Sequence, residues 1–258
     1  MLHGMFPGSH GLREELKTAV CRANLDLVAR GLVLETWGNL SGIDREEGLV
    51  VIKPSGVPYS ALRPRHMVVV SLNDGRVVEG KLRPSSDTPT HLELYRAFAG
   101  IGAVAHTHSL FATAWAQAER EIPVLGTTHA DAFYGPVPCT RPLRAAEIKT
   151  DYEQNTGKVI VETFAKLDRG DSPLFPQRKK GTVPLCVPGV LVAEHGPFVW
   201  GRTPEETVAN AAILEAVARM ASETLRIAPD AKPIGRVLLD KHFLRKHGPA
   251  ATYGQRDG

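Results

Sequence analysis

The sequence feature that most constrains the fold is a run of small and apolar residues that ends in two histidines, Ala103-Val104-Ala105-His106-Thr107-His108-Ser109. Such a run indicates the end of a buried strand. Side chains two positions apart on a strand leave on the same face, about 6–7 Å apart along the chain. Two imidazoles presented in this way can bind one metal ion at about 2.0–2.1 Å each. The alternative is a pair of strand-end histidines that face solvent, so the pattern predicts a metal centre only with a third ligand.

A candidate third ligand, His195, follows a second apolar run, Gly189-Val190-Leu191-Val192-Ala193. A lone histidine at a strand end is usually structural or exposed. With His106 and His108, however, His195 completes a set of three neutral imidazoles, which is common at catalytic zinc sites and leaves one coordination position open. Imidazole also binds Mn²⁺, Co²⁺ and Ni²⁺, so the ligand type indicates a divalent cation rather than one metal.

Asp87 is a further candidate beside this centre. Its carboxylate could bind the same ion, or it could act as a base next to the ion. The alternative is a structural role at the start of a helix, because Thr88-Pro89 predicts an N-cap followed by a proline at the first helical position. The spacing alone leaves these roles open.

The composition limits the function classes. A chain of 258 residues with 43% hydrophobic and 23% charged residues can bury the core of one α/β domain. A net charge of +3, with no basic stripe of interleaved aromatic residues, argues against a nucleic-acid partner. Three cysteines without CxxC spacing favour a reducing compartment. With no signal peptide and no apolar run near the ~18 residues of a membrane span, we expect a soluble, cytoplasmic protein with no membrane partner.

The pattern along the chain alternates between helix and strand. Residues 1–11, which hold three glycines and a proline, are expected to form an extension, and residues 12–258 a single domain. Apolar residues at helical spacing predict a helix over 12–30 that ends at Gly31. Short apolar runs, with a hairpin turn at Asn73-Asp74-Gly75, predict strands over residues 32–34, 49–52, 67–72, 77–78 and 187–200.

Further helices are predicted from caps and spacing. Thr88 and Pro89 are expected as the N-cap and first residue of a helix that runs to Phe98. Thr203-Pro204-Glu205-Glu206 predicts a capping box at the start of another helix. Polar residues with three prolines predict an exposed loop over 168–184. The remaining helices are predicted over residues 109–118, 144–149, 157–167, 203–225 and 235–246.

Three polar loops, over 36–42, 53–56 and 84–89, carry groups that could hold an anion. Turns that contain glycine expose backbone N–H groups, and serine and asparagine side chains add donors. None is a Walker loop or a dinucleotide-binding GxGxxG motif, and each alone could be an ordinary turn. Next to a metal centre they predict a small phosphorylated substrate, held by Gly38, Asn39, Lys53, Ser55, Gly56, Ser85 and Ser86.

Longer motifs surround these residues and continue to the end of the chain: Thr36-Trp37-Gly38-Asn39, Val51-Ile52-Lys53-Pro54-Ser55-Gly56-Val57, Pro84-Ser85-Ser86-Asp87-Thr88-Pro89-Thr90-His91, Gly126-Thr127-Thr128-His129-Ala130-Asp131, Glu194-His195-Gly196-Pro197-Phe198, Leu239-Asp240-Lys241-His242 and Tyr253-Gly254-Gln255. With these motifs the chain resembles the class II aldolase and epimerase family from about Leu12 to Gln255, and within it the members that epimerise L-ribulose 5-phosphate.

The resemblance implies a metal site and a phosphate site. His106, His108 and His195 would bind zinc or another divalent cation, with Asp87 close to the metal or on it. The three polar loops would bind the substrate, a phosphorylated ketopentose, with Lys53 beside them. The implied fold is a three-layer αβα domain of class II aldolase type, with a central, mostly antiparallel sheet.

The resemblance also implies an acid/base pair and an assembly. Asp131 and Tyr253 match the family's acid and base, and His242 matches a supporting active-site residue. Members of the family are C4-symmetric homotetramers whose active sites are shared between subunits. Asp131, His242 and Tyr253 would therefore come from the neighbouring subunit.

The implied reaction interconverts L-ribulose 5-phosphate and D-xylulose 5-phosphate, as in the breakdown of L-arabinose or L-ascorbate. The C4 proton is not α to the C2 carbonyl, so simple enolisation cannot invert C4. Retro-aldol cleavage of C3–C4, rotation of the aldehyde and re-formation of the bond can invert it. A divalent cation would stabilise the enediolate fragment as a Lewis acid, and each face of the aldehyde needs its own proton-transfer group.

Two alternatives stand beside this prediction. An aldolase of the same family would stop at cleavage, but there the carboxylate beside the phosphate serines is typically glutamate rather than Asp87. A non-catalytic binding protein on the same fold, such as the adducin head domain, lacks the full ligand set. The chain departs from the family pattern in its N-terminal extension, in the long loop over 168–184 and at Glu194, where a small polar residue is more usual.

Overall fold

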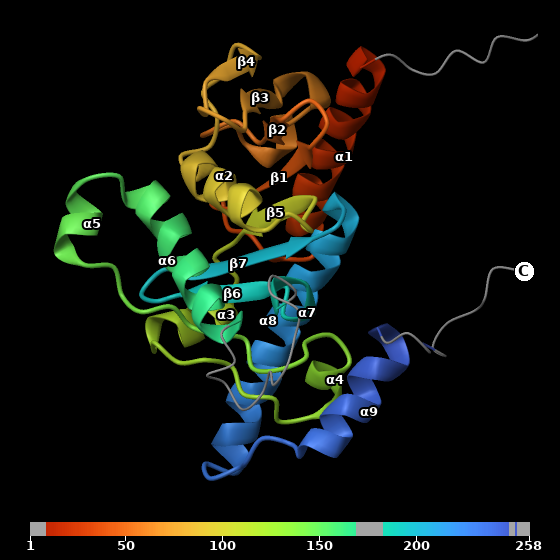
Figure 1. Cartoon of the computed structure of the whole chain (residues 1–258), viewed down its shortest axis with the longest axis vertical. Helices are drawn as coiled ribbons and strands as arrows, with labels where there is room; N and C mark the ends of the chain where they lie inside the picture. The colour runs from red at the N-terminus through yellow and green to blue at the C-terminus, as the bar shows by residue number, and fades with distance from the viewer. Residues whose placement is uncertain (1–8, 169–182, 248–250, 252–258) are drawn as a thin grey trace, which may run out of the picture.

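The computed structural model describes residues 9–168, 183–247 and 251 (Figure 1). Its helices and strands alternate along the chain, as the sequence pattern predicts. In order, they are α1 (Ser9–Ala29), β1 (Asn39–Asp44), β2 (Leu49–Ile52), η1 (Tyr59–Ala61), η2 (Pro64–His66), β3 (Val68–Ser71), β4 (Val77–Glu79), α2 (Thr88–Ala97), β5 (Ala103–His106), α3 (Leu110–Gln117), α4 (Thr127–Ala130), α5 (Ala145–Lys149), α6 (Tyr152–Asp168), α7 (Val183–Cys186), β6 (Gly189–Val192), β7 (Gly196–Gly201), α8 (Pro204–Ile227) and α9 (Arg236–His247).

The named strands form one seven-stranded sheet with the order β4-β3-β2-β1-β5-β7-β6. Each pair of neighbouring strands is antiparallel. β1 is the middle strand, and its Ser41 pairs with Val104 of β5, which in turn pairs with Trp200 of β7. The prediction of a central, mostly antiparallel sheet is confirmed.

Helices cover both faces of the sheet (Figure 1). On one face, the ring of Trp200 lies 5.4 Å from that of Phe98, at the end of α2, and 5.2 Å from that of Phe164 in α6. On the other face, Gly42 and Gly189 make room for α1 and α8, since a Cβ at these positions would lie 2.9 and 2.8 Å from leucine side chains of those helices. The predicted three-layer αβα arrangement is therefore confirmed.

The prediction of a polar loop over 36–42 is partly wrong, because residues 39–44 form β1. Asparagine, serine and glycine have low strand propensity, but here they lie between two partner strands. Leu40 and Ser41 are fully buried, so tertiary pairing outweighs the local preference. The prediction of a strand over 32–34 is also wrong, since Leu34 makes only an isolated bridge with Trp37.

Several helix boundaries differ from the prediction. Asp87 is the N-cap of α2, so Thr88 is its first residue, and α6 begins at Tyr152, five residues before its predicted start. α1 begins at Ser9, inside the predicted extension. The predicted loop over 168–184 overlaps helix at both ends, because residue 168 is the last of α6 and Val183 is the first of α7. Residues 169–182, between them, lie outside the described part of the chain.

The predicted capping box of α8 is half formed. The Thr203 Oγ1 accepts a hydrogen bond from the Glu206 N–H at 3.2 Å, as predicted. The Glu206 carboxylate instead accepts from the Arg202 N–H at 2.7 Å. In the described ranges of the chain, none of the helices has the length and apolar character required to cross a lipid bilayer.

Candidate metal centre and active site

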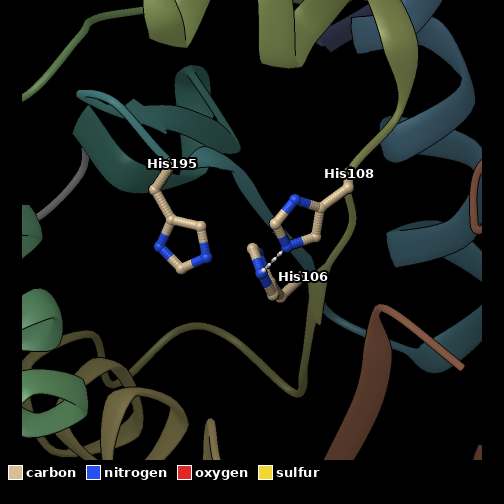
Figure 2. A group of neighbouring side chains, drawn as sticks. All are labelled: His106, His108 and His195. Carbon is tan, nitrogen blue, oxygen red and sulfur yellow. Dashed lines mark hydrogen bonds between the residues drawn. The ribbon is translucent and has the colours of Figure 1, made fainter.

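The three histidines predicted as metal ligands lie at the ends of neighbouring strands or in the segments that follow them. His106 is the last residue of β5, and His108 follows it by two residues. His195 lies in the turn between β6 and β7. His106 pairs with Phe198 near the start of β7, which brings the β6–β7 turn to the end of β5. Figure 2 shows the three imidazoles gathered around one point.

The distances between the rings suit a shared ion. His106 Nε2 and His108 Nε2 are 3.1 Å apart, and one ring nitrogen from each of the three histidines lies within 4.8 Å of the others. His106 Nδ1 lies 3.0 Å from the Pro197 carbonyl oxygen, to which it donates. In the neutral ring the lone pair is then on Nε2, which faces the other two histidines. The same ring stacks on Phe198 at 4.2 Å, so His106 is held in this orientation.

The surroundings favour the neutral form of these rings. Burial, together with the neighbouring His106 and His108, lowers the pKa of His195 to about 3. Burial and His106 also lower the pKa of His108. Neutral imidazole is the form that binds metals, and three converging imidazole nitrogens are a donor set of catalytic zinc sites. The residues present therefore fit a divalent cation.

Asp87 lies beside the three histidines but is not part of the group of mutually close ligand atoms. Asn39 Nδ2 donates to Asp87 Oδ2 at 2.6 Å. Burial raises the pKa of Asp87, but nearby His106 and His91 and the bond from Asn39 lower it, and the net result is a pKa below the usual value. Asp87 is thus an ionised carboxylate at the edge of the cluster. Asn39, predicted to bind substrate, orients this carboxylate in the structure.

The three loops predicted to bind an anion meet beside this cluster. Backbone hydrogen bonds of 2.9 and 3.0 Å, donated by Ser55 and Ser85, join the second loop to the third. Tyr59 Oη, in η1 just after the second loop, donates to the Gly38 carbonyl of the first loop at 2.9 Å. Ser85 is buried, whereas Ser55 and Ser86 are exposed. The loops therefore present exposed hydroxyls on a connected backbone frame.

The position of Gly38 requires a residue without a side chain. Its φ of +104° lies in the region that L-residues rarely adopt. A Cβ there would also lie 2.9 Å from the His106 carbonyl oxygen. This glycine lets the first loop approach the strand that carries the metal ligands.

Lys53 is the buried cation of this region, with 2% of its surface exposed. Its Nζ lies 4.7 Å from the centroid of the Tyr59 ring and 3.3 Å from the Pro54 carbonyl oxygen. Burial lowers the pKa of Lys53, and the Asp87 carboxylate opposes that shift. A cation placed in this way can interact with an anionic ligand at the neighbouring loops.

Asp131, predicted as an acid/base group, and His242, predicted as a supporting residue, are in contact. Asp131 Oδ1 lies 3.0 Å from His242 Nδ1, and the same carboxylate pairs with Arg245 at 3.0 Å and with Lys246 at 3.1 Å. These partners come from α9, which lies against α4 at the bottom of Figure 1. Among the contacts of the described residues, none joins Asp131 to the three histidines. Burial raises the pKa of Asp131, but His242, Lys246 and Arg245 lower it, and the net shift is downward.

Two further sequence features have different outcomes. Tyr253, predicted as the second acid/base group, lies outside the described residues. Glu194, the unusual residue before His195, is exposed and has a positive φ of 62°. Its N–H donates to the Ala116 carbonyl at 3.0 Å, and its carboxylate is not part of the histidine group.

Two polar residues around the centre were not among the predicted site residues. Tyr152 Oη lies 3.3 Å from His195 Nδ1. His91 is fully buried in α2, where its Nδ1 lies 2.7 Å from Ser41 Oγ. His91 lies inside the motif that begins at Pro84, so the motif itself could have identified it as a site residue. Tyr152 follows a polar stretch and lies outside all of these motifs, so no local sequence pattern identified it as a site residue.

Comparison with known proteins agrees with this geometry. Residues 18–222 match the class II aldolase and adducin N-terminal domain family. The chain is 53% identical over 243 residues to L-ribulose-5-phosphate 4-epimerase UlaF of Salmonella paratyphi A and of Salmonella typhi. Each match covers 94% of this chain and 100% of the relative.

Solved structures share the fold at lower identity. An L-fuculose 1-phosphate aldolase aligns with a TM-score of 0.70 at 23% identity, over 88% of this chain and 94% of that one. YgbL from Klebsiella pneumoniae aligns with a TM-score of 0.66 at 22% identity, over 92% and 99% of the two chains. The predicted resemblance is confirmed, and the chain belongs to the class II aldolase and adducin N-terminal domain family.

Proposed function

We propose that this protein is an L-ribulose-5-phosphate 4-epimerase, which interconverts L-ribulose 5-phosphate and D-xylulose 5-phosphate. The observation that carries the proposal is the convergence of His106, His108 and His195 beside three joined polar loops. Relatives with this name match over their whole length at 53% identity. The substrate class follows from the loops, whose exposed hydroxyls and backbone N–H groups suit a phosphate.

In this proposal the three histidines hold a divalent cation, with zinc as the first candidate and Mn²⁺, Co²⁺ or Ni²⁺ as alternatives. When bound there, such a cation would supply Lewis-acid stabilisation of developing negative charge, worth several kcal/mol. His106 brings a lone pair already oriented by its bond to Pro197. Asp87, ionised and fixed by Asn39, either adds a carboxylate ligand or accepts a proton from the substrate.

The remaining residues hold the substrate and move protons. Ser55 and Ser86, on loops braced by backbone bonds, bind the phosphate and keep the aldehyde fragment in the site while it rotates. Lys53 balances the phosphate charge from its buried position. Asp131 and Tyr253 act on opposite faces of the aldehyde, where the C4 oxygen is deprotonated on one side and protonated on the other.

We further propose that the active sites are shared within a C4 homotetramer. In a single chain, Asp131 contacts His242 and the cations Arg245 and Lys246 of α9. A neighbouring subunit that supplies Asp131, His242 and Tyr253 would complete the site. This arrangement has the head-to-tail interface that closes a ring of identical subunits.

The direct test is an assay with L-ribulose 5-phosphate as substrate and the metal content known. We expect D-xylulose 5-phosphate as the main product and loss of activity on treatment with a chelator. Free dihydroxyacetone as the main product would assign an aldolase instead. Absence of turnover together with absence of a stoichiometric divalent ion would assign a binding protein on the same fold.

A further inference from the structure

Tyr152, the first residue of α6, lies against the outer side of the metal centre. Its hydroxyl oxygen is 3.3 Å from His195 Nδ1, and the two rings lie 6.1 Å apart at an interplanar angle of 33°. The other ring nitrogen of His195 is turned toward His106 and His108 (Figure 2). His195 is thus placed between the tyrosine on one side and the two histidines on the other.

This placement determines which nitrogen of His195 can bind a cation. A neutral imidazole carries one proton, and the nitrogen that binds a metal must be the unprotonated one. If Nε2 faces the ion, Nδ1 carries the proton and needs an acceptor, and the Tyr152 oxygen lies within hydrogen-bond range. His106 follows the same rule, since its Nδ1 donates to the Pro197 carbonyl at 3.0 Å. Partners of this kind fix the ring orientation of metal-binding histidines.

The position of Tyr152 is itself held by contacts between α6 and α2. Thr90 Oγ1 donates to the Glu153 carbonyl oxygen at 2.6 Å, and Gln154 Nε2 donates to Glu93 Oε1 at 3.0 Å. At Gly157 the helices are so close that a Cβ would lie 2.6 Å from the Glu93 Cβ. The residue before α2 is Asp87, so the paired helices link the positions of Asp87 and Tyr152.

We propose that Tyr152 is a positioning residue of the metal centre, whose hydroxyl accepts the Nδ1–H of His195 and so keeps Nε2 oriented and unprotonated for the cation. This inference rests on the part of the proposed function that assigns a cation to the three histidines. It does not depend on which sugar phosphate is the substrate.

The first test measures metal affinity in Tyr152→Phe, which removes the hydroxyl and keeps the ring. Loss of such a partner typically lowers metal affinity 10–100-fold, and we expect about 10-fold weaker Zn²⁺ binding in competition with a chromophoric chelator. The visible absorption spectrum of the Co²⁺-loaded variant should also differ from that of the wild type, because the orientation of His195 changes. A purely structural tyrosine would alter the stability of the protein without changing that spectrum.

The matched control is Tyr134→Phe. Tyr134 also uses its hydroxyl, but it bonds to Asp240 and Arg236 of α9. We expect this variant to bind Zn²⁺ with wild-type affinity and to keep the wild-type Co²⁺ spectrum. Equal Zn²⁺ affinity and an unchanged Co²⁺ spectrum in Tyr152→Phe would overturn the inference.

A second measurement keeps the proposal testable if Tyr152→Phe does not fold. Long-range ¹H–¹⁵N correlation spectra of the metal-free wild-type protein report the tautomer of His195 directly. We expect a proton on Nδ1, and a proton on Nε2 would overturn the inference. A protein that binds Zn²⁺ through a Tyr152-dependent site but leaves L-ribulose 5-phosphate unchanged would refute the proposed function and leave this inference in place. A wild-type protein that binds no divalent cation would overturn the inference itself.

Discussion

At the scale of the residue, the three histidines of the candidate metal centre are supported to different degrees. His106 is 2% exposed, donates to a carbonyl and stacks on Phe198. His195 has the hydroxyl of Tyr152 beside Nδ1. His108, past the end of β5, is half-buried and has the ring of Trp37 6.4 Å away. Removal of His108 should therefore disturb the surrounding packing less than removal of His106.

We expect His108→Asn to lose both the bound cation and activity. The shorter amide cannot bring a ring nitrogen to the position beside His106 Nε2, and two imidazoles hold zinc far more weakly than three. Metal analysis after gel filtration and the epimerase assay measure the two losses. His66→Asn in η2 is the control and should keep both, and stoichiometric metal in His108→Asn would contradict the ligand assignment.

Asp131→Asn should behave differently, because the residue is proposed to transfer protons rather than to bind metal. Turnover should fall by ~10²-fold or more, the typical loss when an acid/base group is removed. The metal content should stay at the wild-type level, since the Asp131 carboxylate contacts α9 residues. A wild-type rate would refute the role of Asp131.

At the scale of the element, the position of the site depends on how closely α2 and α6 pack. A Cβ added at Gly157 would lie 2.6 Å from the Glu93 Cβ and 3.1 Å from the Thr90 carbonyl oxygen. Backbone and Cβ atoms at such distances cannot move aside as the end of a flexible side chain could. The pair of helices must separate to admit a methyl group.

We therefore expect Gly157→Ala to lower the free energy of unfolding by about 1–3 kcal/mol, the usual range for overpacking. Urea denaturation measures the change. Lys158→Ala, an exposed position one residue further along the same helix, is the control and should stay within about 0.5 kcal/mol of the wild type. If Gly157→Ala matched Lys158→Ala, the close packing of the two helices would be wrong.

At the scale of the whole molecule, a shared active site makes a prediction about mixed assemblies. His108→Asn subunits, inactive alone, and Asp131→Asn subunits, strongly slowed alone, should regain activity when they are unfolded together and reassembled. In a ring, each site takes its histidines from one subunit and its aspartate from the next. The site is intact when the first subunit carries Asp131→Asn and the second carries His108→Asn, which random mixing provides in about a quarter of sites. No recovery in a mixture that forms tetramers would place both residues in one subunit.

Buried histidines make the stability of the whole molecule depend on pH. Burial lowers the pKa of His91 to about 3 and that of His129 to about 4 in the folded state. Unfolded histidine titrates near 6.5, so between about pH 6.5 and 4 the unfolded state binds more protons than the folded state. Their contribution to stability is complete above that window and is lost as the pH falls through it.

We expect the free energy of unfolding, measured by urea at pH 7 and at pH 5, to be lower at pH 5, by at most about 1.4 kcal/mol per pH unit for each buried histidine. His129→Gln should reduce this dependence. In the wild type, His129 Nε2 is 2.9 Å from the Gly135 carbonyl oxygen, and the side-chain amide of glutamine can donate a hydrogen bond to the same oxygen. Equal stability at both pH values would contradict the assignment of buried, neutral histidines.

Much of the fold and of the candidate site could be predicted because the relevant patterns are local. The alternation of apolar runs and helical periodicity indicated an α/β domain, and strand-end motifs identified the three histidines. β1 could not be recognised in this way. Its Asn39, Ser41 and Gly42 look like a loop until β2 and β5 pair with them.

The sequence by itself determined most of the elements, the motifs and the family, because these depend on residues close together in the chain or on motifs compared as a whole. Only the tertiary structure brought Tyr152 to His195, 43 residues later, and Asp131 to His242, 111 residues later. Contacts over such separations depend on how helices pack on the sheet, here on glycines such as Gly157 and Gly42 that allow close approach. That packing energy is spread over many residues, and no short pattern records it.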